Sequence, residues 1–267
     1  MFDFHKIGII GLGFVGSAIK SSMDGLNLVL IDNDPSRGGH RYEDIPGCEG
    51  VFVCVPSPQG DDGSCDTSIL EDVLGKLKAI NYTGVIISKT TAPPSVYKRL
   101  QEQYSNLVHA PEFLTAANAE MDYLDGRFAI IGGAVSAYRN EAERIIRVSQ
   151  TSLQQVNHCS IEEAALSKYA INSFLSTKVV FMNELHQLAT ASGLNYTTIA
   201  KNMMLDKRIG DSHMRVPGPD GVFGFGGMCF PKDTSALLKY AEEVHTTMNV
   251  LDAAVKKNTL LRLTEPK

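Results

Sequence analysis

Short apolar runs alternate with amphipathic stretches along the first part of the chain. The runs are typical of buried strands and cover residues 6–10, 28–32, 50–55, 84–88, 106–109 and 128–132. The stretches between them, such as residues 67–79, show the spacing of apolar positions that indicates a helix. Strands that alternate with helices predict an α/β fold with a doubly wound parallel sheet of the Rossmann type.

The pattern changes after about Val156, where the strand-like runs stop. Ser160 is the expected N-cap of a helix, with Glu162 and Glu163 in its first turn, and apolar residues then recur at helical spacing to about residue 191. Further helices are predicted at 196–204 and 234–263, separated by a Gly/Pro-rich segment at 210–227. We therefore predict a Rossmann domain at 1–157 and a smaller all-helical domain at 158–267 that ends in a long helix.

A glycine loop follows the first predicted strand. In the sequence GLGFVG at 11–16, Gly11 permits a tight turn, Gly13 lets the backbone approach a pyrophosphate, and Gly16 lets the helix pack on the strand. Asp32 ends the next strand 21 positions after Gly11, which is the spacing of a carboxylate that binds the cofactor ribose. A carboxylate there repels a 2′-phosphate, so the loop predicts NAD rather than NADP. The alternative, that the glycines serve only a turn, is disfavoured by this context.

Composition excludes several classes of partner. The net charge of −5 and the lack of a basic cluster give no binding surface for nucleic acid or an anionic membrane. No apolar run approaches the ~20 residues of a membrane span, and the first six residues do not resemble a signal peptide. The five cysteines are scattered without metal or disulfide spacing, so we expect no metal site. A cytoplasmic protein with a small-molecule partner is expected.

One cysteine lies in an unusual setting. Cys229 follows Gly224, Gly226 and Gly227, which would let the backbone come close to a ligand, and Lys232 and Asp233 come shortly after it. If Cys229 lies near the start of the last helix, the helix N-terminus and the lysine both favour the reactive thiolate. The alternative is a buried, inert cysteine, and the glycine-rich setting argues against it.

A second candidate pair lies on the helix that begins near Ser160. Lys168 and Asn172 are four residues apart, so they share a face of a helix that is otherwise apolar. Such a lysine can donate to a substrate hydroxyl or stabilise an oxyanion, and the asparagine amide can bind the same oxygen. From this helix alone, an exposed polar stripe is an equally good interpretation.

Taken in order, these motifs resemble the UDP-glucose/GDP-mannose dehydrogenase family. The resemblance rests on GLGFVG at 11–16, VPSP at 55–58, KTT at 89–91, PEFL at 111–114, Lys168 with Asn172, RIG at 208–210 and GFGGMCFPKD at 224–233. The glycine loop is generic, and the Lys/Asn helix is shared with the wider 3-hydroxyacid dehydrogenases. The run that contains Cys229 is highly specific.

The resemblance implies an activity and a set of residues. Such enzymes oxidise the C6 alcohol of a nucleotide sugar to a carboxylate and pass two hydrides to two NAD molecules. Cys229 matches the nucleophile that forms a thiohemiacetal and then a thioester. Lys168 and Asn172 match the residues that stabilise the reacting oxygen, Asp233 and Thr91 match those that position the hydrolytic water, and Glu112 matches the acidic residue of thioester hydrolysis. The implied cofactor-binding residues are Gly11, Gly13, Phe14, Val15, Gly16, Asp32, Pro56, Thr91 and Lys232. The implied substrate-binding residues are Phe113, Leu114, Lys168, Asn172, Arg208, Arg215, Phe223 and Gly226.

Three departures from the family are expected to matter. Ala116 stands where many members have a second glutamate, so hydrolysis is expected to be slower or organised differently. The stretch between the second strand and Val51 is short for the family. The sequence ends after the last predicted helix, so a C-terminal UDP-binding domain is expected to be absent. The segment 213–221, and Arg215 in particular, is then expected to supply part of the substrate contact.

Two other functions remain open at this point. A two-domain β-hydroxyacid dehydrogenase that performs a single oxidation fits the length but leaves Cys229 unexplained. A non-catalytic NAD-binding subunit is disfavoured by the presence of Cys229, Lys168, Asn172 and Asp233 together. We expect a homodimer, because the last predicted helix has an apolar face that would otherwise be exposed, although packing within the chain is an alternative. This face comprises Leu237, Leu238, Tyr240, Ala241, Val244, Val250, Leu251 and Ala254.

Overall fold

The computed structural model describes residues 6–115 and 118–264, which fall into two compact units. The first unit contains the described residues of Met1–Gly60 and Cys65–Lys168. The second contains Asp61–Ser64 and the described residues of Tyr169–Lys267. Helix α6 (Ile161–Ala191) belongs to the first unit as far as Lys168 and to the second from Tyr169 onward.

A seven-stranded sheet forms the centre of the first unit. Its strands, in the order β2-β1-β3-β4-β5-β6-β7, are β2 (Leu28–Ile31), β1 (Ile7–Ile10), β3 (Gly50–Val53), β4 (Val85–Ser88), β5 (Leu107–His109), β6 (Phe128–Gly132) and β7 (Gln155–Cys159). The six apolar runs predicted from the sequence each contain one of the first six strands. The Rossmann-type fold class is therefore confirmed.

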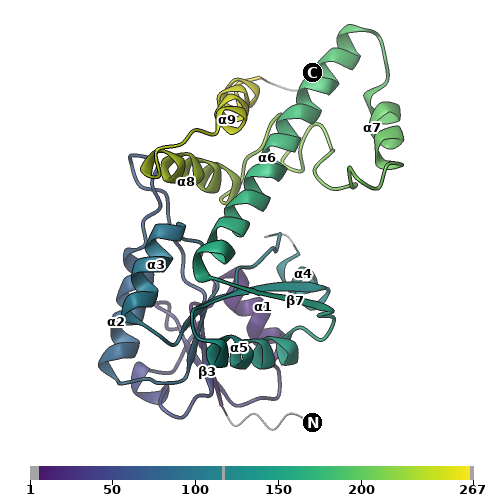
Figure 1. Cartoon of the computed structure of the whole chain (residues 1–267). Helices are drawn as coiled ribbons and strands as arrows, with labels where there is room; N and C mark the ends of the chain where they lie inside the picture. The colour runs from purple at the N-terminus through teal and green to yellow at the C-terminus, as the bar shows by residue number, and fades with distance from the viewer. Residues whose placement is uncertain (1–5, 116–117, 265–267) are drawn as a thin grey trace. The chain divides into compact units, whose positions relative to one another are not determined.

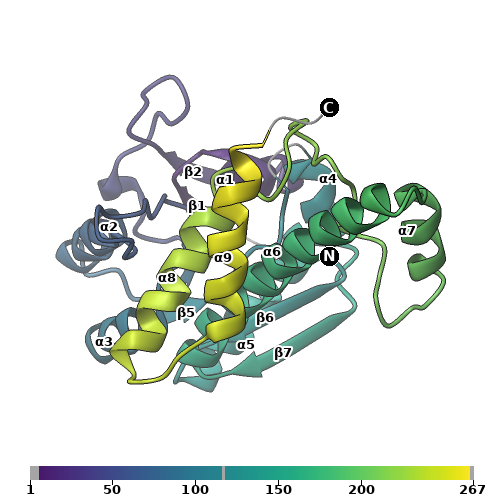
Figure 2. The same cartoon turned by 90° about the horizontal axis from the view of Figure 1, so that it is seen from above.

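Helices cover both faces of the sheet, as the alternation of side chains along each strand requires. Ile9 packs in a core with helices α1 (Phe14–Ser22), α4 (Ala119–Leu124) and α5 (Ser136–Ser149). Ile10 packs in a second core with helices α2 (Ser68–Ala79) and α3 (Pro94–Gln103), close to the short 3₁₀ helix η1 (Tyr42–Asp44). Helices α2 and α3 lie next to each other in both views (Figure 1, Figure 2).

The order of the strands in the sheet reverses at β1. The chain leaves β1 toward β2 and then returns to the other side of β1 to form β3. In such sheets the ligand site opens beyond the carboxyl ends of the strands at this reversal. Gly11 and Cys54 follow these two strand ends, and the Cys54 N–H donates to the Ile10 carbonyl oxygen at 2.7 Å. The predicted cofactor loop therefore lies at the reversal.

Two features of the sheet differ from the sequence prediction. Residues Gln155–Cys159 form strand β7, although the strand-like runs were expected to stop there. This strand is at the edge of the sheet and mostly exposed, so it lacks the apolar signature of a buried strand. Strand β6 runs antiparallel to β5, so the sheet is mostly rather than wholly parallel.

The second unit is helical apart from its loops. It contains the larger part of α6, together with α7 (Tyr196–Met204), α8 (Phe230–Glu243) and α9 (Asn249–Arg262). The predicted start of α6 is confirmed, because the Ser160 Oγ accepts from the Glu163 N–H at 3.2 Å and the Glu163 carboxylate accepts from the Ser160 N–H at 2.8 Å. The predicted helix at 196–204 is confirmed as α7.

The prediction of one long terminal helix over residues 234–263 is wrong. The segment forms two helices, α8 and α9, which lie side by side (Figure 1, Figure 2). His245 adopts a left-handed conformation, with φ of 57°, just after α8, and this turns the chain back on itself. Half of the apolar face expected to form a dimer is covered within the chain, since Leu237, Ala241, Leu251 and Ala254 are buried, whereas Val244 and Val250 are exposed. Packing within the chain, the alternative to a dimer, therefore accounts for these four buried residues.

Across the described ranges 6–115 and 118–264, none of the helices combines the length and hydropathy needed to cross a lipid bilayer.

Candidate active site

The glycine loop has the geometry that a dinucleotide requires. Gly11 has φ of 87°, and a Cβ on it would lie 2.6 Å from the Cys54 carbonyl oxygen. A Cβ on Gly16 would lie 1.8 Å from the Gly11 carbonyl oxygen, so no larger residue fits there. A Cβ on Gly13 would meet no atom within 4 Å. Since no side chain caps the N-terminus of α1, its N–H groups and the open space at Gly13 fit a pyrophosphate.

Asp32 lies just beyond β2 and is oriented by two backbone N–H groups. Its Oδ2 accepts from the Leu12 N–H at 2.6 Å, and its Oδ1 accepts from the Asp34 N–H at 2.8 Å. Each carboxylate oxygen can accept more than one hydrogen bond, so the group can still bind ribose hydroxyls. Its position beside the glycine loop agrees with the predicted ribose contact.

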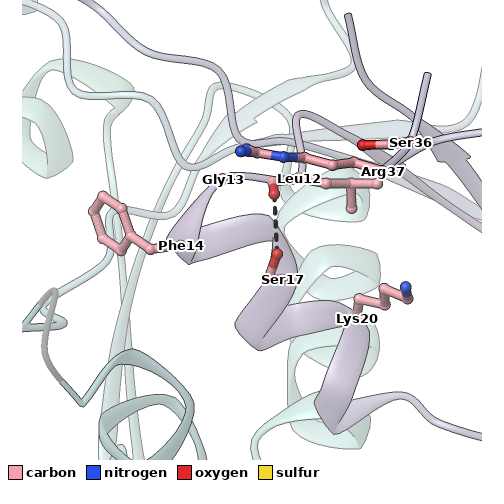
Figure 3. Close-up of a pocket in the computed structure, with 7 residues that line it drawn as sticks. All are labelled: Leu12, Gly13, Phe14, Ser17, Lys20, Ser36 and Arg37. Atoms are coloured by element: carbon pink, nitrogen blue, oxygen red, sulfur yellow. Dashed lines mark hydrogen bonds between the residues drawn. The ribbon is translucent and has the colours of Figure 1, made fainter. Parts of the chain in front are cut away.

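A pocket of about 460 Å³ opens beside this loop (Figure 3). Its lining residues are Leu12, Gly13, Phe14, Ser17, Lys20, Ser36 and Arg37. Figure 3 shows Phe14 directed away from Lys20 and Arg37, and Ser17 donating to the Leu12 carbonyl oxygen, a bond of 3.0 Å. The sequence analysis missed Lys20, Ser36 and Arg37, although Lys20 lies one turn beyond Ser17 on α1. Val15 is partly buried against the core rather than in the pocket lining.

Glu112 and Lys168 form a buried ion pair in the first unit. The Lys168 Nζ lies 3.1 Å from the Glu112 Oε1 and donates to the Glu112 carbonyl oxygen at 2.6 Å. The Glu112 Oε2 accepts from the Leu114 N–H at 2.7 Å, and the Lys168 Nζ lies 5.2 Å from the centre of the Phe113 ring. Both charged side chains are buried, so each depends on the other for a counter-charge.

Thr91 lies shortly after β4 and is hydrogen-bonded to the segment that follows β3. The Thr91 carbonyl oxygen accepts from the Ser57 Oγ at 2.6 Å, while the preceding Thr90 donates from its Oγ1 to the Val55 carbonyl oxygen at 2.8 Å. These bonds join the VPSP and KTT motifs. Pro56 is exposed.

In the second unit, Asp233 is the centre of a buried polar cluster. Its Oδ2 accepts from the Asn172 Nδ2 at 2.6 Å, and its Oδ1 lies 2.5 Å from the Lys232 Nζ. Asp233 and Asn172 are both buried. Asn172 and Lys168, one turn apart on α6, are both buried, so the alternative of an exposed polar stripe is wrong.

Cys229 is the N-cap residue of α8. Its carbonyl oxygen accepts from the Asp233 N–H at 2.8 Å, in the first turn of the helix. The N-terminal end of a helix favours a negative charge, so this position favours the thiolate. The thiol and the Asp233 cluster thus belong to one helix start, as the sequence predicted.

Two asparagines that the sequence analysis missed fix the glycine-rich segment before the thiol. The Asn183 Oδ1 on α6 accepts from the Gly224 N–H at 3.0 Å. The Asn258 side chain on α9 accepts from the Phe225 N–H at 2.7 Å and donates to the Phe225 carbonyl oxygen at 3.0 Å. Both asparagines are buried, so the conformation of the segment is determined by α6 and α9. The sequence gives little signal for these roles, because Asn183 and Asn258 stand among other polar residues of their helices.

The predicted substrate-binding residues of the second unit lie in different environments. Arg208 has a side chain that is 89% exposed and pairs with Asp206, and Arg215 is exposed. Gly226 lies against the guanidinium of Arg262, since a Cβ on Gly226 would be 2.8 Å from its Nη2. Phe223 is partly buried, with its ring 5.6 Å from that of His186. Ala116, expected to affect hydrolysis, lies outside the described residues.

Comparison with known proteins gives a consistent picture. The profile of the UDP-glucose/GDP-mannose dehydrogenase family, NAD binding domain, matches residues 38–150. The profile of the same family's central domain matches residues 162–260.

A UDP-glucose 6-dehydrogenase of Rickettsia conorii is 33% identical over 224 residues, which cover 80% of this chain and 50% of that protein. One of Rickettsia bellii is 30% identical over 297 residues, covering 95% of this chain and 66% of that protein. A UDP-glucose dehydrogenase structure from Pyrobaculum islandicum matches with a TM-score of 0.81 and 25% identity, covering 97% of this chain and 68% of that one. The chain spans about half to two thirds of the length of these curated relatives. Both profiles describe one family and follow each other along the sequence, so this chain belongs to the UDP-glucose/GDP-mannose dehydrogenase family.

Proposed function

We propose that the chain catalyses the NAD-dependent oxidation of a nucleotide sugar, of the UDP-glucose type, at its C6 alcohol to the carboxylate. The observation that carries the proposal is the position of Cys229 at the N-cap of α8, with Lys232 and Asp233 in the first turn of this helix. Asn172 of α6 donates to the Asp233 carboxylate. A single alcohol oxidation needs no thiol. An oxidation that proceeds to the acid does, because a thioester keeps the intermediate bound between the two steps.

The chemistry assigns a task to each residue. NAD supplies the hydride acceptor when bound, and two equivalents are consumed for each sugar. The Cys229 thiolate adds to the C6 aldehyde to give a thiohemiacetal. Loss of the second hydride gives a thioester, and attack by water releases the carboxylic acid and the thiol. Thr91 and Asp233 are proposed to position this water, by resemblance to the family.

Lys168 is proposed to stabilise the oxygen on the reacting carbon together with Asn172. The Lys168 ammonium has three N–H groups, and two of them donate to Glu112. The third remains for a substrate oxygen. Glu112 is proposed to act in hydrolysis of the thioester, which requires its ionised form if it acts as a base.

Binding of the cofactor is proposed to use the glycine loop, Asp32 and the pocket beside them. Gly13 leaves space for the pyrophosphate, and Asp32 has the spacing and the orientation for ribose hydroxyls. Binding of the sugar nucleotide is proposed to involve Arg208 and Arg215, whose exposed guanidinium groups suit phosphate oxygens.

A homodimer is proposed, but through a different surface from the one the sequence indicated. Phe174, Phe181 and Leu188 recur every seventh residue on α6 and are 57–69% exposed. This α6 stripe lies on one side of the helix, and a second copy of the same helix would cover it. We also propose a cytoplasmic location and a place in polysaccharide biosynthesis. The five cysteines form no disulfide with one another, which suits a reducing compartment.

The test is an initial-rate assay of NADH formation with a panel of UDP-glucose, GDP-mannose and related nucleotide sugars. Cys229→Ser is compared with Cys159→Ser, because Cys159 is likewise half-buried and outside any disulfide but lies at the end of β7. We expect one or more sugars to support NADH formation, with acid production lost in Cys229→Ser and retained in Cys159→Ser. Equal activity in the two variants would refute the thiol mechanism.

A further inference from the structure

A buried tyrosine of the first unit reaches back from α3 to the loop that precedes this helix. Tyr97 lies near the start of α3 and is fully buried. Its hydroxyl donates to the Thr90 carbonyl oxygen at 2.5 Å. A tyrosine hydroxyl has a single proton, so the Ser88 Oγ, 2.7 Å away, donates to it. This one hydroxyl therefore joins α3 to the end of β4 and to the loop between them.

The position of the Tyr97 side chain is fixed by the sheet rather than by this loop. Its ring stacks on that of His109 in β5, with the centroids 4.2 Å apart and the planes at 26°. The His109 Nδ1 lies 3.1 Å from the Ser88 carbonyl oxygen in β4. Burial also raises the pKa of the Tyr97 hydroxyl, so it stays protonated near neutral pH. Tyr97 is therefore a well-oriented donor to the loop.

The hydrogen bond to Thr90 bears directly on Thr91, because the two residues share a peptide group. The Thr90 carbonyl and the Thr91 N–H lie in one plane, so Tyr97 fixes the peptide group that precedes Thr91. The Ser57 Oγ donates to the Thr91 carbonyl oxygen at 2.6 Å and fixes the peptide group that follows it. With both planes held, the φ and ψ angles of Thr91 and the direction of its Cα–Cβ bond are determined.

We propose that Tyr97 is a positioning residue that acts through the Thr90 carbonyl to hold Thr91 in the orientation that places the hydrolytic water. This inference rests on the proposed function for its catalytic consequence. The ordering of Thr91 concerns only residues of the first unit and can be tested separately. The alternative is a hydroxyl that only stabilises the fold, since a buried tyrosine hydroxyl usually finds a partner.

The first test compares Tyr97→Phe with Tyr82→Phe. Phenylalanine keeps the ring and removes only the hydroxyl. The Tyr82 hydroxyl also donates to a backbone carbonyl, that of Cys48 at 3.1 Å, but Tyr82 precedes β4 and Thr91 follows it. Chemical unfolding should show a lower free energy of unfolding for both variants. With UDP-glucose and NAD, kcat is expected to fall about 10- to 100-fold in Tyr97→Phe and to stay native in Tyr82→Phe.

The step that slows in Tyr97→Phe should be hydrolysis of the thioester. Intact-protein mass spectrometry after a rapid quench should therefore show more of the covalent adduct on Cys229 in Tyr97→Phe than in the native chain or in Tyr82→Phe. A hydroxyl that only stabilises the fold would leave kcat and the amount of adduct equal in the two variants. That result would overturn the proposal.

The second test needs no activity. Methyl NMR spectra are recorded for chains with isotopically labelled threonine. The signals of Thr90 and Thr91 are expected to shift or split in Tyr97→Phe and to keep their native positions in Tyr82→Phe. Native signals for both threonines in Tyr97→Phe would also overturn the proposal. If the native chain does not oxidise UDP-glucose, the proposed function fails for that sugar, and the methyl spectra alone decide whether Tyr97 orders Thr91.

Discussion

Replacement of Asn258 by alanine should destabilise the segment that precedes the Cys229 thiol, which is proposed to be the nucleophile. Asn258 is 8% exposed, and its side chain makes two hydrogen bonds to the backbone of Phe225, four residues before Cys229. Alanine removes both partners and leaves a buried N–H and a buried carbonyl oxygen without hydrogen bonds. Each such group costs about 1–3 kcal/mol, so we expect the free energy of unfolding to fall by about 2–6 kcal/mol.

The same change should lower kcat more than it affects binding of NAD. Misplacement of a nucleophile by about 1 Å can reduce the rate roughly 100-fold. The cofactor loop belongs to the first unit, so its affinity for NAD should stay close to the native value. Chemical unfolding, kcat and calorimetric titration of NAD measure the three quantities.

Two variants serve as controls for Asn258→Ala. Asn258→Asp keeps the acceptor for the Phe225 N–H but loses the donor to its carbonyl oxygen, so it should show an intermediate loss. Asn202→Ala changes an exposed asparagine of α7 and should be neutral. A loss in Asn258→Ala no larger than that in Asn202→Ala would refute the reasoning.

Three further outcomes are expected. Burial lowers the pKa of His109 in the folded chain to about 3, so the unfolded chain binds more protons between pH 3 and 6.5 and the free energy of unfolding falls on acidification through this window. His109→Phe should remove up to about 5 kcal/mol of that fall. An equal pH dependence of the free energy of unfolding in both proteins would contradict this. Gly16→Ala should lower the free energy of unfolding, because a Cβ at this position meets the Gly11 backbone. Gly13→Ala should leave the free energy of unfolding unchanged but weaken NAD binding measured by calorimetry. A native NAD affinity in Gly13→Ala would argue against a pyrophosphate at this loop. Phe181→Lys should convert a dimer to a monomer in sedimentation analysis, and an unchanged mass would exclude the α6 stripe as the interface.

The sequence was sufficient to predict elements whose signal is local. Buried strands such as β1 and β3 are continuous apolar runs, and the start of α6 is marked by a serine and a glutamate at capping distance. Strand β7 was missed because an exposed edge strand has no such run. The break between α8 and α9 was missed because no proline or glycine marks it, and the turn depends on His245 in a left-handed conformation.

The residues of the candidate site also fall into two groups, those that the sequence was sufficient to predict and those that only the structure shows. Cys229, Lys168 and Asp233 stand in recognisable motifs, so their residue types and spacing were enough to select them. Asn183 and Asn258 act through partners distant in sequence, and only the folded chain shows that Asn183 meets Gly224 and that Asn258 meets Phe225. Such roles depend on tertiary contacts that a single sequence does not encode locally.

The most direct test of the proposed function is the number of NADH molecules formed per sugar at limiting nucleotide sugar, with identification of the product. The account predicts two NADH and the sugar acid for the native chain, and arrest before acid release in Cys229→Ser. One NADH per sugar, with the same value in Cys229→Ser, would contradict the thioester route and indicate a single oxidation instead.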